Sequence, residues 1–263
     1  MNTFLPTKRL GQHFLIDASI LSRIVDSCEL CPNDEVLEIG PGQGALTRGL
    51  IPRVKKLIAV EADPVLADSL GRELSASGLL LHNTDFLKFD LHGLFARPFK
   101  VIGNIPYNIS TPIVEKMLAD RSLVRSLYLT VQYEFARRLT APVGTKDRSA
   151  LTCLLEVFAT SRILFRISNQ AFRPIPKVES CFIHIDFQAS PGFPVKDEAF
   201  FSKVVKTAFL QRRKTLVNAL LPLGAKARLE SALAFAGVDK KTRPEDVRSA
   251  DYVRIANHLL EGG

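Results

Sequence analysis

Short apolar runs alternate with segments of helical periodicity along most of the chain up to residue 189. The runs lie at 35–40, 56–61, 79–85, 99–104 and 127–132. Apolar runs of this length, separated by helix-length segments, are typical of parallel strands that are buried on both faces of a sheet. The alternation therefore predicts an α/β fold in which helices cover both faces of a mostly parallel sheet.

The pattern changes after residue 160. Residues 162–167 and 181–187 alternate apolar and polar positions, which predicts strands near a sheet edge, and one of them could run antiparallel. Proline and glycine in 188–194 indicate a linker. Helices are expected beyond it, at 197–221, 225–236 and 251–260. We therefore expect an α/β domain over 1–189 and a small all-helical domain over 190–263.

Composition narrows the class of protein. The 263 residues are 46% hydrophobic, which is enough to bury a core without disulfides or metals. No apolar run reaches the length of a transmembrane helix, and residues 1–11 precede no secretory apolar stretch, so we expect a cytoplasmic protein that does not contact the membrane. Cys28 and Cys31 form a lone CxxC without a nearby histidine, which favours structural thiols over a metal site.

The net charge of +8 is unevenly distributed along the chain. The first 195 residues carry a net charge of +3, and the last 68 carry +5. A basic tail on a nearly neutral body suggests a polyanionic partner, attracted by electrostatic steering and counterion release. A merely soluble cationic helical domain explains the same charge equally well, so charge alone does not choose between them.

Candidate chemistry follows the first strands. The first apolar run ends in the glycine-rich loop Glu38-Ile-Gly40-Pro-Gly42-Gln-Gly44, where glycine permits positive φ and a close approach by a ligand. Glu61 ends the second run and could accept both hydroxyls of a ribose. Asp85 ends the third and could accept a hydrogen bond from an adenine amine. Together they predict a site for an adenosine-containing cofactor.

Two cofactors remain possible at this point. Gly40 and Gly42 followed by Ala45 satisfy the dinucleotide pattern GxGxxG/A, which would indicate NAD. Glu38 instead gives ExGxGxG, the spacing associated with S-adenosylmethionine (SAM), whose ammonium and sulfonium charges suit a nearby carboxylate. A dinucleotide site would use the helix N-terminus for a pyrophosphate. These features favour SAM.

The fourth run ends in Asn104-Ile105-Pro106-Tyr107, which resembles the (D/N/S)-P-P-Y motif of enzymes that methylate exocyclic amines. The amine of adenine is a poor nucleophile because its lone pair is delocalised into the ring. The Asn104 side-chain oxygen and the Ile105 carbonyl could hold its two hydrogens and aim the nitrogen at a methyl group. Pro106 stiffens the turn, and Tyr107 offers a face for an extruded base.

The ordered set of motifs is similar to the KsgA family of ribosomal RNA adenine dimethyltransferases. The resemblance covers essentially the whole chain. It rests on Leu10-Gly-Gln-His-Phe-Leu15, Glu38–Gly44, Asn104-Ile-Pro-Tyr-Asn-Ile-Ser110, Val131-Gln132, Phe172-Arg-Pro-Ile-Pro-Lys-Val-Glu-Ser180 and Phe209-Leu-Gln-Arg-Arg-Lys214.

The resemblance implies a class I SAM-dependent methyltransferase fold, Rossmann-like, with a mostly parallel seven-stranded sheet and a helical C-terminal domain. It implies a monomer that transfers four methyl groups to two adjacent adenosines near the 3′ end of 16S rRNA, in small-subunit biogenesis. Phe172 would stack on the target base opposite Tyr107. The cofactor would contact the glycine loop and the strand ends, through His13, Leu15, Glu38, Gly40, Gly42, Glu61, Asp85 and Asn104.

Basic residues are candidates for RNA contacts. One group brackets a loop containing proline and glycine: Arg137, Arg138, Lys146 and Arg148. A second group is expected within the helix 197–221: Arg212, Arg213 and Lys214. We expect both groups to contact phosphates without reading sequence, although a solvated basic face explains them too. Many relatives carry Asn where this chain has His13, and a Lys where it has Tyr133.

Other functions stay open on the sequence alone. A dimethyltransferase that acts on large-subunit rRNA would share the chemistry. A non-catalytic RNA-binding or ribosome-assembly factor is a second alternative, against which Glu61, Asp85 and the turn at Asn104 argue. An NAD oxidoreductase is the weakest alternative because no catalytic acid or base is evident near the cofactor.

Overall fold

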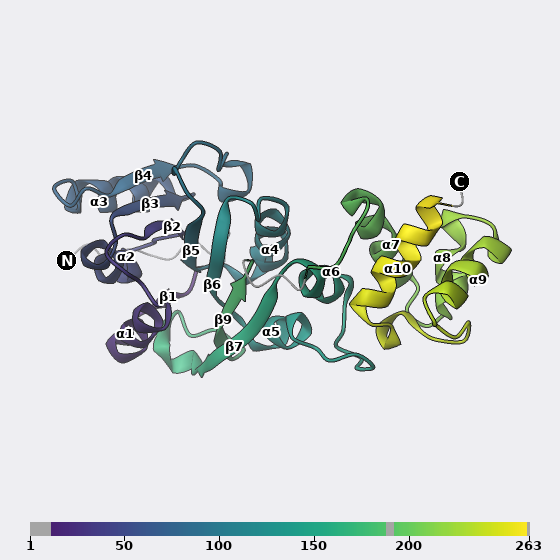
Figure 1. Cartoon of the computed structure of the whole chain (residues 1–263). Coiled ribbons are helices and arrows are strands. Elements are labelled where there is room, and N and C mark those ends of the chain that lie inside the picture. The colour runs from purple at the N-terminus through teal and green to yellow at the C-terminus, as the bar shows by residue number, and fades with distance from the viewer. Residues whose placement is uncertain (1–11, 188–191, 262–263) are drawn as a thin grey trace. The chain divides into compact units, whose positions relative to one another are not determined.

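The computed structural model describes residues 12–187 and 192–261 (Figure 1). These residues form two compact units. The sheet unit contains residues 12–136 and 162–187, and the helical unit contains residues 137–161 and 192–261. The expected domain boundary at 189/190 lies outside the described residues. Residues 137–161, which the sequence assigned to the α/β domain, pack with the helical unit.

The sheet has the strand order β4-β3-β2-β5-β6-β9-β7. Its first four neighbouring pairs are parallel, and β9 runs antiparallel to β6. The seven-stranded, mostly parallel sheet expected from the sequence is confirmed. A separate two-stranded sheet pairs β1 (Phe14–Leu15) with β8 (Phe172–Arg173). The strands of the main sheet are β2 (Glu35–Ile39), β3 (Lys56–Glu61), β4 (Leu80–Asn83), β5 (Phe99–Asn104), β6 (Val124–Gln132), β7 (Thr160–Ile167) and β9 (Ser180–Asp186).

Helices connect the parallel strands and cover the sheet. The connecting helices are α2 (Ala45–Leu50), α3 (Pro64–Glu73) and α4 (Ser110–Ala119), whereas α1 (Ala18–Ser27) precedes β2 and α5 (Tyr133–Leu139) follows β6. Helix α3 packs against β3 and β4, and α4 packs against β6. Each central strand is buried almost throughout, because helices cover the apolar side chains on both of its faces.

The chain reverses its order in the sheet between β2 and β5. Strand β2 lies between β3 and β5, so the connections leave β2 and β5 in opposite directions. Open α/β sheets bind ligands in the crevice at such a point, outside the carboxyl ends of the strands. The glycine-rich loop follows β2, and Asn104 ends β5. The fold therefore places both motifs at the same edge.

The helical unit consists of α6 (Ala150–Phe158), α7 (Glu198–Leu210), α8 (Leu216–Leu220), α9 (Lys226–Phe235) and α10 (Ser249–Glu261). The single helix predicted over 197–221 is wrong. Gln211 leaves the helical conformation at φ −129° and ψ 54°, and the N–H of Lys214 closes a turn on the Gln211 carbonyl. The break lets apolar residues on both α7 and α8 reach one core. No helix in residues 12–187 and 192–261 has the length and apolarity required to cross a membrane.

Candidate active site

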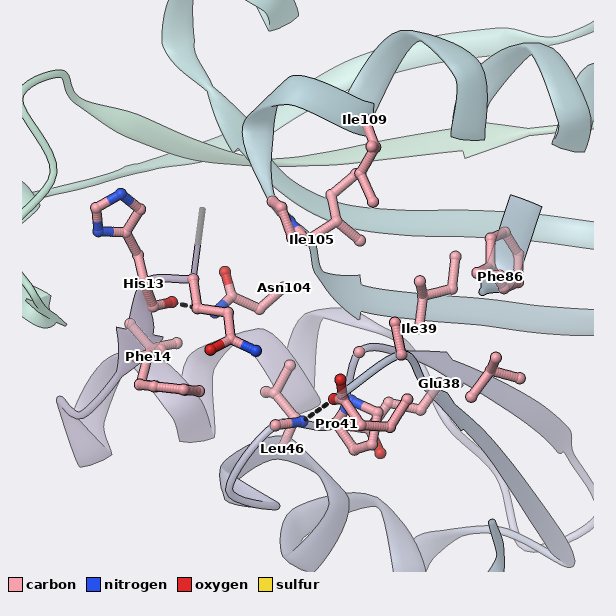
Figure 2. A pocket seen from close by; sticks show the side chains of 18 of the residues that line it. His13, Phe14, Glu38, Ile39, Pro41, Leu46, Phe86, Asn104, Ile105 and Ile109 are labelled. Carbon is pink, nitrogen blue, oxygen red and sulfur yellow. Dashed lines mark hydrogen bonds between the residues drawn. The ribbon is translucent and has the colours of Figure 1, made fainter. Parts of the chain in front are cut away.

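A cavity of about 390 Å³ lies at the carboxyl edge of β2, β3 and β5. Its size is that of a pocket for a small molecule. It brings together the predicted cofactor residues and most of the predicted catalytic residues: His13, Leu15, Glu38, Gly40, Gly42, Glu61, Asp85, Asn104, Ile105, Pro106 and Tyr107. Figure 2 shows the cavity between two groups of residues, with Ile105 and Ile109 on one side and Glu38, Pro41 and Leu46 on the other.

The glycine-rich loop forms one wall through its backbone. Gly40 and Gly42 have φ of +64° and +57°, a left-handed conformation that side-chain-bearing residues rarely adopt. A Cβ on Gly40 would meet no heavy atom within 4 Å, so the backbone is open to a ligand there. A Cβ on Gly42 would lie 3.1 Å from the Phe14 ring, which shows how closely the N-terminal segment covers the loop.

Glu61 is held at the end of β3 by the backbone. Its Oε2 accepts from the Gly42 N–H at 2.9 Å, and its Oε1 accepts from the Asp63 N–H at 2.9 Å. Burial raises the pKa of Glu61, and these two hydrogen bonds oppose the rise. Each carboxylate oxygen retains a further lone pair, so a bound diol can still donate to Glu61.

Glu38 is the most buried carboxyl in the cavity wall. It is 1% exposed, and its Oε2 has no hydrogen-bond partner among the residues that the structure describes. Burial, with a smaller contribution from the neighbouring Glu61 charge, raises the pKa of Glu38 to about 8, and hydrogen bonding from Thr47 to the carboxyl opposes this rise. An unpartnered carboxyl oxygen in a low-dielectric wall fits a ligand that carries positive charge.

Asp85 lies two residues beyond the end of β4, on an exposed loop. Its Oδ1 accepts from the Leu87 N–H at 3.0 Å, which fixes the carboxylate at the edge of the cavity. The adjacent Phe86 is buried and, with Ala62 next to Glu61, adds apolar wall. Sequence reasoning missed both residues, although each directly follows a carboxylate that the motif analysis had singled out.

Asn104 has a defined orientation at the end of β5. Its Nδ2 donates to the His13 carbonyl at 3.0 Å (Figure 2). His13 is itself anchored, since its Nδ1 lies 2.8 Å from the Pro174 carbonyl. Because the amide nitrogen is engaged with the N-terminal segment, the Asn104 Oδ1 is left as the acceptor of the side chain.

Tyr107 follows the same turn. Its hydroxyl lies 2.5 Å from Ser180 Oγ, and its ring stacks on the His13 ring with centroids 5.7 Å apart. Burial raises the pKa of Tyr107, so the phenol stays neutral. Ser180 was not singled out from the sequence, although it closes the proline-containing motif that begins at Phe172. It fixes the position of the Tyr107 ring.

Phe172 does not reach the cavity. It is fully buried, and its backbone pairs with Leu15 in the small sheet of β1 and β8. Its ring belongs to a core cluster that includes Phe165 and Phe182. The expectation that Phe172 faces a base opposite Tyr107 is wrong, because its ring packs inside this core cluster and is not exposed.

The prediction that Arg148 contacts RNA is also wrong. Its side chain is fully buried in the helical unit, where it donates to both Glu156 carboxylate oxygens, at 2.8 and 2.6 Å. It also donates to the Ala141 carbonyl at 3.1 Å and to Ser249 Oγ at 3.0 Å. These contacts use the guanidinium to join a loop to α6 and α10, so Arg148 cannot contact RNA.

The other predicted RNA contacts also lie in the helical unit, at or near its surface. Arg137 forms an ion pair with Asp147, and Arg138 is exposed on the same helix. Arg212 donates to the Lys146 carbonyl at 2.6 Å, which brings the two basic segments together. Arg213 and Lys214 are exposed in the turn after α7 rather than on a helix face.

A mostly parallel sheet of this order, with β9 antiparallel and an acid-flanked glycine loop at the switch point, defines the class I SAM-dependent methyltransferases. Within that class the family is also clear. The chain belongs to the ribosomal RNA adenine dimethylase family, whose model matches residues 4–261.

Individual relatives agree with the family. Two proteins named ribosomal RNA small subunit methyltransferase A are similar to the chain. The protein from Pseudomonas fluorescens is 40% identical over 97% of this chain and 94% of its own, and the one from Chromobacterium violaceum is 39% identical over 100% and 99%. The crystal structure of the 23S rRNA methyltransferase ErmE matches with a TM-score of 0.73 and 30% identity, covering 94% of this chain and 99% of that one. A dimethyladenosine transferase from Plasmodium falciparum shares the fold, with a TM-score of 0.79, 24% identity, and 92% and 95% coverage.

Proposed function

We propose that this protein dimethylates the N6 amines of two adjacent adenosines near the 3′ end of small-subunit rRNA, with SAM as the methyl donor, during biogenesis of the small ribosomal subunit. The observation that carries the proposal is the orientation of Asn104, whose Nδ2 is held by the His13 carbonyl at the edge of the cavity. The names of the curated relatives support the choice of the small subunit.

The residues of the cavity fit SAM as its cofactor. Glu61 would accept the ribose hydroxyls, Asp85 would accept from the adenine amine, and the open backbone at Gly40 leaves room for the ligand. Glu38 supplies the buried carboxyl that a cationic methionine moiety needs. When bound, SAM would supply an electrophilic methyl group on a sulfonium.

The target amine would be held at the turn after β5. The Asn104 Oδ1 and the Ile105 carbonyl would accept the two N6 hydrogens, which favours a pyramidal nitrogen with its lone pair aimed at the methyl group. The Tyr107 ring, fixed by Ser180, would flank the base. After attack the nitrogen is cationic and its proton is acidic, so water suffices as the base. Positioning and electrostatics supply most of the acceleration.

Large-subunit rRNA is a second candidate substrate. The similarity to the structure of the 23S rRNA methyltransferase ErmE, at 30% identity, favours it. The identities of 39–40% to proteins named for the small subunit favour our proposal more strongly. Both substrates would use the same cavity, so only the product separates them.

The test supplies radiolabelled SAM to the purified protein with ribosomal subunits from cells that lack the modification. We expect label in the small subunit, and reverse-transcription stops at adjacent adenosines near the rRNA 3′ end. Label confined to the large subunit would overturn the proposed substrate in favour of large-subunit rRNA. No label in either subunit, with SAM binding retained, would favour a non-catalytic RNA-binding factor.

A further inference from the structure

In the sheet unit, the exposed side chain of Arg166 packs on the ring of the half-buried Tyr133. The guanidinium carbon of Arg166 lies 3.9 Å from the centroid of the Tyr133 ring, and its Nη2 donates to the Tyr133 hydroxyl. Its Nη1 lies 3.7 Å from Glu179 Oε2. The Arg166 side chain is nevertheless 59% exposed. One face of the guanidinium is therefore fixed on an aromatic ring, and the other is available for stacking.

The pair lies beside the turn that carries Asn104. Strands β5 and β6 are parallel with Asn104 opposite Thr130, so Tyr133, just beyond the end of β6, lies at the same sheet edge. The Tyr133 N–H donates to the Glu179 carbonyl at 3.0 Å. The next residue, Ser180, holds the Tyr107 hydroxyl at 2.5 Å. A short chain of contacts thus links Arg166 to the proposed catalytic turn.

We infer that the Arg166–Tyr133 pair is a stacking platform for the nucleotide next to the adenosine being methylated. The inference rests on the proposed function, in which the target adenosine has an adenosine neighbour. An unpaired base stacks well on a guanidinium plane, and the positive charge attracts the adjoining phosphate. A nucleotide flanking the target must lie within one backbone step of the turn, and Tyr133 is connected to that turn through Glu179 and Ser180.

The same strand offers a matched control. Arg162 also lies on β7, its side chain is 60% exposed, and its guanidinium lies 3.7 Å from a glutamate, Glu29. Arg166→Ala should raise the KM for small-subunit RNA roughly tenfold, the scale of one lost stacking contact. Arg162→Ala should leave that KM unchanged. The Kd for SAM should be unchanged in both variants, because neither residue lines the cavity.

Two further variants separate stacking from charge. Arg166→Lys keeps the charge and loses the plane, so we expect it to behave like Arg166→Ala. Recovery of the wild-type KM by lysine would make the contact a phosphate contact and overturn the platform. Tyr133→Phe retains the ring and should stay near wild type, whereas Tyr133→Ala should raise the KM and add little to Arg166→Ala.

The inference and the proposed function fail differently. If the wild-type protein does not methylate small-subunit RNA, the proposed function falls. If the wild-type protein methylates it and Arg166→Ala matches Arg162→Ala in KM, only the platform is overturned. Mapping the methylated adenosines adds a second readout, since loss of the platform should lower the yield at one adenosine of the pair more than at the other.

Discussion

Glu38 shows how strongly a side chain depends on its surroundings. In the sequence it is an acidic residue before a glycine loop. In the fold it is a carboxyl that burial keeps protonated near neutral pH, with an oxygen that no group in the described part of the chain satisfies. Such a group costs stability in the free protein and favours a cationic ligand. Its cost depends on pH, which makes it measurable.

Glu38→Gln should raise the thermal stability at pH 8 and change it little at pH 5. The folded-state pKa near 8 lies above the ordinary value of 4.5. Between these values the unfolded chain has released the proton and the folded chain has not, so the free energy of unfolding falls as the pH rises. A neutral amide removes that fall. We expect a Tm at least about 3 °C above wild type at pH 8, measured by calorimetry without cofactor.

Glu61 also titrates with a raised pKa and is present in both proteins, so the comparison reports the Glu38 carboxyl together with its electrostatic coupling to Glu61. If the Tm difference between Glu38→Gln and wild type is the same at pH 5 and pH 8, the carboxyl does not titrate in this range.

Asn104→Ala should lower kcat about 100-fold or more, because the amine loses the oxygen that positions it. The Kd for SAM should rise by less than about tenfold, since Glu61 and Asp85 remain. Asn104→Asp keeps an acceptor oxygen and loses the hydrogen bond to the His13 carbonyl, so its kcat should lie between that of the wild type and that of Asn104→Ala. Single-turnover methylation and calorimetric titration of SAM measure these effects. Full activity in Asn104→Ala would place the transfer elsewhere.

At the scale of elements, the contact between β2 and β5 determines the shape of the cavity edge. A Cβ on Gly103 would lie 2.9 Å from the Ile39 carbonyl oxygen, which is backbone and cannot move aside cheaply. The two strands approach this closely just before the glycine loop and Asn104 diverge. Spacing between strands therefore determines the spacing between the cofactor wall and the catalytic turn.

Gly103→Ala should destabilise the protein by about 1–3 kcal/mol because the strands must separate. It should also weaken SAM binding. The control is Gly71→Ala in α3, where a Cβ would meet only Leu81 Cδ2 at 3.6 Å. That variant should be neutral or stabilise by up to about 1 kcal/mol, since alanine favours helix. Urea unfolding measures the change in the free energy of unfolding for each variant. An equal change for Gly103→Ala and Gly71→Ala would refute the close contact between β2 and β5.

At the scale of the whole molecule, the cavity residues and the predicted phosphate contacts lie in different units. The residues that line the cavity belong to the sheet unit, whereas the predicted phosphate contacts belong to the helical unit. The bond between Arg212 and the Lys146 carbonyl joins the two basic segments of the helical unit. We propose on this basis that the sheet unit binds the cofactor and the target base, and that the helical unit contacts the RNA backbone.

Arg212→Glu with Arg213→Glu should weaken binding to a small-subunit rRNA fragment, more at low salt than at high salt. Removing phosphate contacts should reduce the slope of log K against log salt by about 1 to 2. The control is Lys203→Glu with Lys226→Glu, on α7 and α9. It changes the net charge of the protein by the same amount as Arg212→Glu with Arg213→Glu. Filter binding at several salt concentrations measures the slopes. Identical slopes for the two double variants would show that Arg212 and Arg213 do not contact phosphates and belong to a solvated basic surface.

The alternation of strands and helices, the glycine loop and the polar groups at the strand ends can all be predicted from the amino-acid sequence. Each of these follows from local periodicity or from residue types a few positions apart. Parallel strands then bring Glu38, Glu61 and Asn104 to one edge without further information.

Which side chains are accessible depends on the packing of the folded chain. Phe172 is buried because β8 pairs with a strand near the N-terminus, and Arg148 is buried because α10 closes over it with Ser249. Arg166, on the edge strand β7, packs on Tyr133 beyond the end of β6, although β9 lies between these two strands in the sheet. Burial depends on which distant segments pack together, and no local pattern around these three residues encodes that pairing.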